Sequence, residues 1–275
     1  MRAERGTVTV YDRKTGASSI AAELVLSMDR AADGGVMALI FVVMNAGLGS
    51  GTYEFRDIAP LAAVAARFNL TDDKGHAIVA GKGPLSVVTA KTIMSIDRGS
   101  WQAARLTTPV AFAGVVHGVQ TSDGVLVGSE AGPLYSINRL TGLTREVKLA
   151  DAAITNVSAL SNDLVKPDCV LVSVAQTAPT PRGYIARVCG QQAESVFTKA
   201  QKDGSTSPVL GVVATPKGWV AVAGGKVIRE SGGKVKESTL GKLKSWKGLN
   251  ILTSNPELVL VQVAGRDAPL FLPVR

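Results

Sequence analysis

The chain has 275 residues, of which 46% are apolar, 19% charged and 5% aromatic, and its formal net charge is +8. This length and apolar content allow a large buried core and argue against a disordered chain. Abundant glycine (29 residues), together with valine and alanine, favours many short strands joined by turns over long helices.

The N-terminal part of the sequence shows no export or membrane signal. Residues 1–27 carry charges throughout and lack the uninterrupted apolar run of a secretory signal. The longest apolar run, VMALIFVVM at 36–44, has nine residues, whereas a helix needs roughly 20 to cross a bilayer. We therefore expect a buried strand at 36–44 and a cytoplasmic protein that does not enter the membrane.

Short apolar stretches that end near a glycine recur along the chain. They occupy 36–47, 76–83, 124–132, 169–176, 219–226 and 258–265. Their glycines at 47, 81, 128, 224 and 265 are 34, 47, 96 and 41 residues apart, and 96 is two periods with the 169–176 stretch between them. The spacing predicts six units of about 45 residues.

Further strands are predicted inside most units. A second apolar stretch follows at 84–90, 133–140, 184–190, 226–230 and 269–275, and a third at 144–150 and 235–241. Three or four short antiparallel strands repeated in this way are typical of a β-propeller. The chain resembles a six-bladed β-propeller over nearly its whole length, without the WD and GH signatures of the best-known propeller class.

This resemblance implies an all-β fold with a single domain at 1–275. The last unit ends after two strands, so the resemblance also implies a ring closed by the N-terminus. The hairpin at 6–16 and 19–27 would then pair with the strands at 258–275 and remove the exposed sheet edges.

One segment favours a different fold class. In 57–70, Ile58, Leu61, Ala65 and Phe68 fall at helical spacing and alanine is frequent. This spacing would suit a short helix, and an α+β protein with two lobes, which draws its support from this segment, is the alternative architecture.

The two cysteines, Cys169 and Cys189, bracket a predicted hairpin. If VLVSVA and GYIARV pair about the turn APTPR, the numbers of facing residues sum to 358, which is also the sum of 169 and 189. The two thiols are therefore expected to lie opposite each other. They are either a disulfide or, as is usual in the cytoplasm, two reduced core cysteines. The scarcity of Asn, Gln and His allows a thermophilic origin, in which an intracellular disulfide is less unusual.

The positive charge is concentrated in one region. Residues 1–137 contain 12 basic and 12 acidic residues, whereas 138–275 contain 18 and 10. Between Lys199 and Lys247 there are ten basic residues against three acidic ones. Such a regional excess is typical of a surface that binds a polyanion.

Within this region the stretch GKLKSWKG (241–248) combines lysines with a tryptophan. The lysines neutralise phosphates and an exposed indole stacks on a base, so this pattern suits a nucleic acid. The alternative is that Trp246 packs in the core and the lysines protect a sheet edge. The candidate nucleic-acid-binding residues are Lys226, Arg229, Lys234, Lys236, Lys242, Lys244, Trp246 and Lys247.

Catalytic and metal-binding signatures are weak. His76 and His117 are the only histidines and neither has a second ligand at metal-binding spacing. Single acids such as Asp97, Asp123 and Asp168 suit a metal site only if distant parts of the chain converge in a central channel. We expect no cofactor and no catalytic residue.

The leading expectation is a non-enzymatic intracellular propeller that docks on a nucleic acid or a ribonucleoprotein assembly such as the ribosome through residues 199–247. RNA is taken as the first candidate, although the residues do not distinguish it from DNA. One alternative is a hydrolase or lactonase with a metal in the central channel. The other is a scaffold that binds only proteins.

Overall fold

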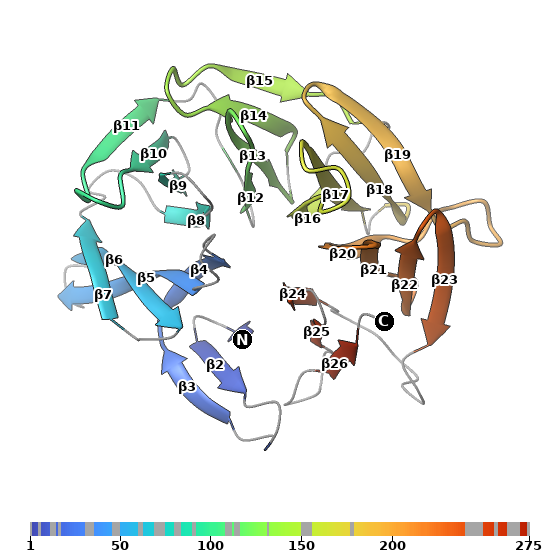
Figure 1. Ribbon diagram of the computed structural model, residues 1–275, viewed down its shortest axis with the longest axis horizontal. Helices are drawn as coiled ribbons and strands as arrows, with labels where there is room; N and C mark the ends of the chain where they lie inside the picture. Colours follow the sequence, from blue (N-terminus) through green and yellow to red (C-terminus); the bar gives the residue numbers. More distant parts are fainter. Residues whose placement is uncertain are drawn as a thin grey trace. The chain divides into compact units, whose positions relative to one another are not determined.

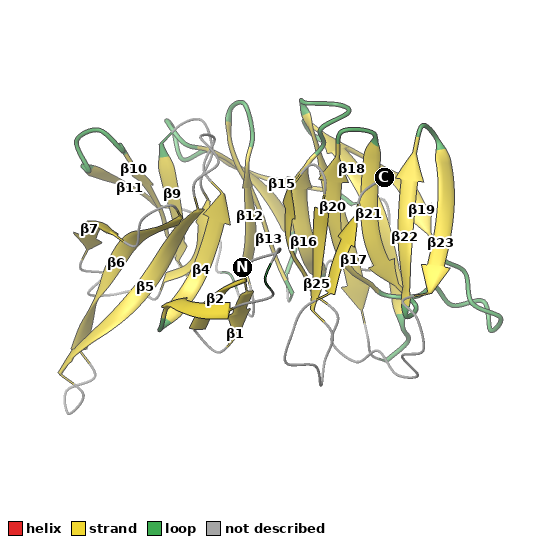
Figure 2. Ribbon diagram, turned by 60° about the horizontal axis from the view of Figure 1, so that its bottom comes forward, coloured by secondary structure: helices red, strands yellow, loops and turns green. Residues whose placement is uncertain are grey.

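The computed structural model describes most of the chain as strands and short turns. The described residues are 2–4, 7–11, 15, 18–30, 36–45, 50–59, 63–68, 75–79, 84–89, 92–107, 112, 116–130, 132–149, 156–176, 179–239, 250–255, 258–262 and 270–273. Figure 2 shows strands and loops, and no helix, in this part of the chain. The all-β class predicted from composition is therefore confirmed.

The chain divides into two compact units, of which the first comprises Met1–Phe112 and Ile137–Thr144. Its sheets are antiparallel, and all their strands except β1, which is labelled in Figure 2, are labelled in Figure 1. They are β1 (Arg2–Glu4), β2 (Thr7–Tyr11) and β3 (Ser18–Ala22); β4 (Val25–Arg30), β5 (Val36–Asn45), β6 (Ser50–Ala59) and β7 (Ala63–Phe68); and β8 (Gly75–Val79), β9 (Leu85–Thr89), β10 (Thr92–Ile96) and β11 (Ala103–Thr107).

The second unit comprises Ala113–Ser136 and Arg145–Arg275. The sheets that lie wholly or mainly in it contain β12 (Val116–Gln120), β13 (Gly124–Ser129), β14 (Leu134–Asn138) and β15 (Thr144–Val147); β16 (Val157–Asn162), β17 (Cys169–Gln176), β18 (Arg182–Cys189) and β19 (Gln192–Thr198); β20 (Val209–Thr215), β21 (Gly218–Ala223), β22 (Lys226–Ser231) and β23 (Lys234–Thr239); and β24 (Asn250–Asn255), β25 (Leu258–Gln262) and β26 (Leu270–Pro273).

The position of a strand in its sheet follows from its composition. The second strands β13 (GVLVGS) and β21 (GWVAVA) are apolar along most of their length and buried at every residue. Such continuous runs suit a strand that is covered on both faces. The last strand of its sheet, β23 (KVKEST), is exposed throughout. The sheet β20–β23 therefore runs from an apolar inner part to a polar outer strand.

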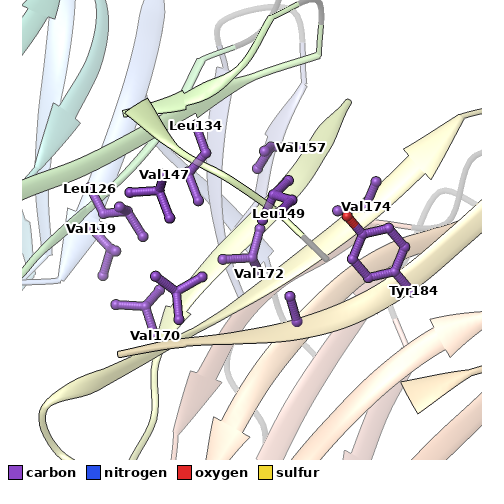
Figure 3. Packing of buried hydrophobic residues seen from close by; sticks show 12 residues of the cluster. Val119, Leu126, Leu134, Val147, Leu149, Val157, Val170, Val172, Val174 and Tyr184 are labelled. Atoms are coloured by element: carbon purple, nitrogen blue, oxygen red, sulfur yellow. The ribbon is translucent and has the colours of Figure 1, made fainter. Parts of the chain in front are cut away.

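Strand β17 contributes side chains to two hydrophobic clusters. Because successive side chains point to opposite faces, Val170, Val172 and Val174 join the cluster with sheet β12–β15 that Figure 3 shows. Leu171 points the other way and packs with Trp219 of sheet β20–β23. The largely apolar stretch CVLVSVA, interrupted only by the buried Ser173, is thus explained by sheets packed on both sides.

The first unit has a core built in the same way. Met37 and Leu39 of β5 and Phe55 of β6 pack against β8, β9 and β10 of the next sheet. All three residues are buried, and so are Leu85 and Ile96 in the sheet opposite. The apolar run at 36–44 therefore belongs to a strand, as expected from its length.

The alternative of a short helix at 57–70 is wrong. This segment contains the end of β6 and the whole of β7, which pair antiparallel with Phe55 opposite Ala66 and Asp57 opposite Ala63. The long strand β5 needs β6 as its partner, and β7 continues the sheet. The hydrogen bonds and packing of the sheet outweigh the local helix propensity of the alanines. The α+β alternative, which depended on this helix, loses its support.

The count of six units and the closure between the chain ends are not confirmed. The described residues form seven sheets, of which five have four strands and two have three. The N-terminal strands β1, β2 and β3 pair with one another, and β24, β25 and β26 form a separate sheet. Residues 1–30 thus contribute a sheet of their own and start the next one. The predicted period omits this sheet because it lacks a long apolar run.

Candidate functional site

The predicted nucleic-acid-binding residues fall into two groups. Lys242, Lys244, Trp246 and Lys247 lie outside the described residues. Lys226 and Arg229 lie on β22, and Lys234 and Lys236 on β23. The structure therefore places four of the eight, all on one hairpin.

The strand register separates these four residues. Arg229 faces Lys236 and Ser231 faces Lys234 across the hairpin. Because side chains alternate along a strand, Arg229, Lys234 and Lys236 share one face, which we call the basic face. Lys226 lies on the opposite face, and no acidic residue of β22 or β23 lies on the basic face.

Lys226 is engaged in an ion-pair cluster. Its Nζ donates to Oε2 of Glu237 at 2.8 Å, and Nζ of Lys199 donates to Oε1 of the same carboxylate. The hydrogen bonds from Lys199 and Lys226 lower the pKa of Glu237. Two of the basic residues at 199–247 are thereby committed to a local structural contact.

The basic face keeps its positive charge uncompensated within the described part of the chain. Like charges directly opposite on neighbouring strands, such as Arg229 and Lys236, repel each other. The Nε of Arg229 is buried and has no hydrogen-bond partner there. Lys234 and Lys236 are exposed. An anion placed at this face would relieve the repulsion and accept hydrogen bonds from the exposed Lys234 and Lys236.

A second feature is the loop between β16 and β17, residues 163–168, which we call the braced loop. Asp163 begins it and is only 2% exposed. Its Oδ1 accepts hydrogen bonds from the backbone amides of Val165 at 2.8 Å and Lys166 at 3.1 Å. Such turns, in which a carboxylate binds amides two and three residues later, fix the backbone of a loop.

The other oxygen of Asp163 ties the loop to β18. Its Oδ2 accepts a hydrogen bond of 2.7 Å from Nε of Arg187, whose side chain is 15% exposed. Burial alone would lower the pKa of Arg187, but hydrogen bonds to Asp163 and Glu194 raise it above its usual value. The guanidinium therefore stays charged and the ion pair intact.

A disulfide braces the end of the loop. Cys169 and Cys189 face each other on β17 and β18 in the register in which residue numbers sum to 358, and they are joined by a disulfide with a Cα–Cα distance of 4.3 Å. The amide of Asp163 donates to the carbonyl of Cys169, and the amide of Cys169 to that of Lys166, both at 2.9 Å. Both ends of the loop are thus closed by backbone hydrogen bonds.

The braced loop presents two apolar side chains to solvent. Leu164 is 52% and Val165 50% exposed. Charged groups surround them, since Lys166 lies 3.8 Å from Glu194 in an exposed ion pair and Asp168 is exposed. Sequence reasoning missed this site, because the turn depends on a carboxylate whose partner arginine is 24 residues away. The only local signal is the Asp-Leu-Val-Lys-Pro-Asp composition of a turn.

The two histidines do not form a site. His117 lies on β12 with its Nε2 buried and without a hydrogen-bond partner in the described structure, and burial lowers its pKa to about 4. His76 lies on β8, and its side chain is not described. Among the residues that the structure describes, no group of three or more His, Cys, Asp or Glu is arranged to hold a metal ion.

The single acids considered for a channel metal lie in hairpin turns. Asp97 accepts hydrogen bonds from the amides of Gly99 and Ser100 and from the Ser100 hydroxyl, which lower its pKa. Asp123 and Asp168 are exposed in the β12–β13 and β16–β17 connections. The described residues also include no helix long and apolar enough to span a membrane.

Comparison with known proteins supports the architecture. No family model and no curated protein matches the sequence. Among solved structures, the computationally designed Ika8 protein has a TM-score of 0.63 and 13% identity, over 99% of this chain and 79% of that one. The β-propeller domain of the Trilobed protease from Pyrococcus furiosus, with an open velcro topology, has a TM-score of 0.55 and 12% identity, over 96% and 83%.

BamB from Moraxella catarrhalis is also similar, with a TM-score of 0.54 and 15% identity, over 95% of this chain and 90% of that one. At such low identities the likeness shows the fold and not the function. The fold is that of β-propeller proteins, without a specific family. The resemblance to a generic propeller is therefore confirmed.

Proposed function

We propose that the chain is a non-enzymatic interaction scaffold that uses the braced loop to hold a partner protein. The observation that carries this proposal is a rigid loop with two exposed apolar side chains, Leu164 and Val165. A preformed loop loses little conformational freedom on binding, which favours affinity. Apolar anchors within a charged rim are the usual composition of a protein interface.

The test replaces the apolar side chains of the braced loop and, separately, an exposed leucine elsewhere. Leu164→Ser with Val165→Ser should abolish capture of a partner from native lysate, while the fold and melting temperature remain unchanged. Leu140→Ser is the matched control, since Leu140 is 91% exposed in a turn fixed by Asn138. If the Leu164/Val165 variant captures the same proteins as the parent chain, the braced loop is not the docking surface.

The basic face supports a second candidate, docking on a nucleic acid such as RNA in a ribonucleoprotein assembly. Three cations share a face without an acid, and the fourth predicted cation is paired elsewhere. Lys234→Ala with Lys236→Ala should weaken binding to single-stranded RNA and reduce the salt slope by about 0.7 for each phosphate that is no longer neutralised. Lys226→Ala is the control and should leave the slope unchanged.

This second candidate also requires the cytoplasmic location that we expect from the sequence, because RNA is accessible there. If the double lysine variant binds RNA with the affinity and salt slope of the parent chain, the basic face does not bind phosphates. An RNA-independent scaffold would then remain.

We also propose that the scaffold is a single domain, which is stable only when both ends of the chain are present. Deleting residues 1–20 removes β1, β2 and part of β3. The loss of these strands should lower the melting temperature and alter the monomeric behaviour, because the sheet β1–β3 can no longer form. Unchanged melting and monomeric behaviour would show that the N-terminal strands are dispensable.

A further inference from the structure

The second unit contains a pocket that neither docking surface uses. It has a volume of about 540 Å³ and lies between the first residues of β18, the outer strand β19 and the loop at 203–206. Pockets of this size typically hold a small molecule. Its walls carry one guanidinium, one carboxylate and several hydroxyl groups.

The loop that forms one wall is a closed hairpin. The amide of Ser207 donates to the carbonyl of Lys199 and that of Gln201 to the carbonyl of Ser205, both at 2.8 Å. Ala200 and Thr206 form an additional bridge between these two bonds. Because the turn is hydrogen-bonded along its length, the wall keeps its shape without a ligand.

Gly183 allows the chain that leaves this loop, at Pro208 and Val209, to lie close to β18. A side chain there would place its Cβ within 2.5 Å of the amide nitrogen of Val209 and 2.6 Å of the carbonyl oxygen of Val174. The amide of Gly183 donates to Oγ1 of Thr206 at 3.0 Å. The hydroxyl of Thr206 is thereby fixed as an acceptor and keeps its own proton to donate to a ligand.

Asp203 supplies the negative charge of the pocket. Its Oδ1 accepts hydrogen bonds from the hydroxyl of Ser205 at 2.6 Å and its amide at 3.0 Å, and these bonds lower the pKa of the carboxyl. The carboxylate is therefore ionised at neutral pH. Its second oxygen has no partner in the described structure and is available to accept.

Arg182 supplies the positive charge. It is exposed and makes no ion pair with Asp203 or with any other acid that the structure describes. The pocket thus holds two opposite charges that do not neutralise each other. A guanidinium in this setting binds a carboxylate through two parallel hydrogen bonds.

Three further hydroxyl side chains, Thr180, Ser195 and Thr198, line the pocket. Hydroxyl groups both donate and accept, so they suit a ligand that carries hydroxyls of its own. We propose that this pocket binds a small polyhydroxylated carboxylic acid of the uronic acid class. Arg182 takes the carboxylate, and Asp203 with the serine and threonine hydroxyls takes the ligand hydroxyls.

The probe is D-glucuronate, with binding measured by titration calorimetry on the full chain. Glucose lacks the carboxylate and glycylglycine lacks the hydroxyls, so both should bind at least tenfold more weakly. Arg182→Gln should weaken glucuronate binding at least tenfold. Asp203→Asn should do the same while its Oδ1 still accepts from Ser205 and preserves the loop.

Arg145→Gln is the matched control, because Arg145 is an exposed arginine on β15 and does not line the pocket. It should leave the affinity for glucuronate unchanged. The proposal is overturned if glucuronate does not bind at millimolar concentration, if glucose binds equally well, or if Arg145→Gln and Arg182→Gln have the same effect. Preferential binding of glycylglycine would assign the pocket to a peptide terminus and also overturn it.

Discussion

Arg187 donates a hydrogen bond of 2.7 Å from its Nε to Oδ2 of Asp163, and this contact joins β18 to the braced loop. The Asp163 side chain is 1% exposed, and its two oxygens accept hydrogen bonds from this partner and from two backbone amides. The contact holds in place the segment that presents Leu164 and Val165. The stability of the braced loop therefore rests on a cation that the strand β18 supplies.

Breaking the Asp163–Arg187 pair should destabilise the protein strongly. Arg187→Leu leaves the buried carboxylate without its cation, which typically costs about 3–5 kcal/mol. Lys166→Ala removes an exposed ion pair with Glu194 at 3.8 Å, and exposed pairs contribute about 1 kcal/mol or less. Chemical denaturation of both variants measures the difference. Equal effects would mean that the buried pair has no special role in stability.

The disulfide should stabilise the hairpin of β17 and β18. The two cysteines are 20 residues apart in sequence, and the loop-entropy model assigns roughly 3 kcal/mol to closing a loop of this length. Cys169→Ala with Cys189→Ala should lower the free energy of unfolding by about this amount. Thiol titration of the denatured parent chain checks the redox state. Two reactive thiols would show that the protein is reduced under those conditions.

The two tryptophans near the basic region should respond differently to truncation. Trp219 is 2% exposed and packs edge-on against Phe197 with ring centroids 5.4 Å apart. Trp219→Ala should therefore cost about 3–5 kcal/mol. Trp246 lies outside the described residues. If it stacks on a base, Trp246→Ala should leave unfolding unchanged and weaken RNA binding by roughly 1–3 kcal/mol.

A large loss of stability in Trp246→Ala would contradict the stacking role. The ring would then belong to the core, and only the lysines would support nucleic acid binding. Thermal melting and RNA titration on the same preparations separate the two cases.

The burial of His117 predicts a pH dependence of stability. Its folded pKa is about 4, below the ordinary value of 6.5. Between these two values the unfolded chain binds a proton at this position and the folded chain does not. Unfolding therefore takes up a proton, and stability falls as the pH is lowered through this window, by up to about 3 kcal/mol.

Denaturant titrations between pH 7 and pH 4 measure this effect. In His117→Gln the decrease should become shallower over the same range, whereas His76→Gln retains the titration of His117. An identical pH dependence in His117→Gln and the parent chain would show that other groups cause the decrease.

The strands of this protein could be predicted from local patterns because their cause is local. Apolar runs such as 36–44 and 169–176 have the length and composition of strands buried on both faces, and each became one. The pairing of the two cysteines could also be predicted, because the numbers of facing residues in a hairpin have a constant sum. The segment 57–70 did not form the helix that its spacing of apolar residues suits. Pairing with β5 and β6 imposed an extended backbone on this alanine-rich segment.

The candidate binding surfaces depend on contacts between residues that are distant in the sequence. Composition located the excess of positive charge in 199–247, but not the face on which each charge lies. The hairpin register placed Arg229, Lys234 and Lys236 together and put Lys226 on the other face, where it pairs with Glu237. A lysine is available to bind another molecule only if it is not already paired with an acidic residue of the same chain. Such pairing depends on the tertiary structure.

Local patterns were thus enough to predict the class of fold, many of the strands and the cysteine pair, because hydrophobic periodicity and turn composition act over a few residues. The number of sheets, the bracing of Asp163 by Arg187 and the pocket between β18, β19 and the loop at 203–206 depend on the tertiary structure. The bracing pair, for example, joins side chains 24 residues apart. Such contacts arise only when sheet pairing has fixed the register, and no local pattern encodes that distance.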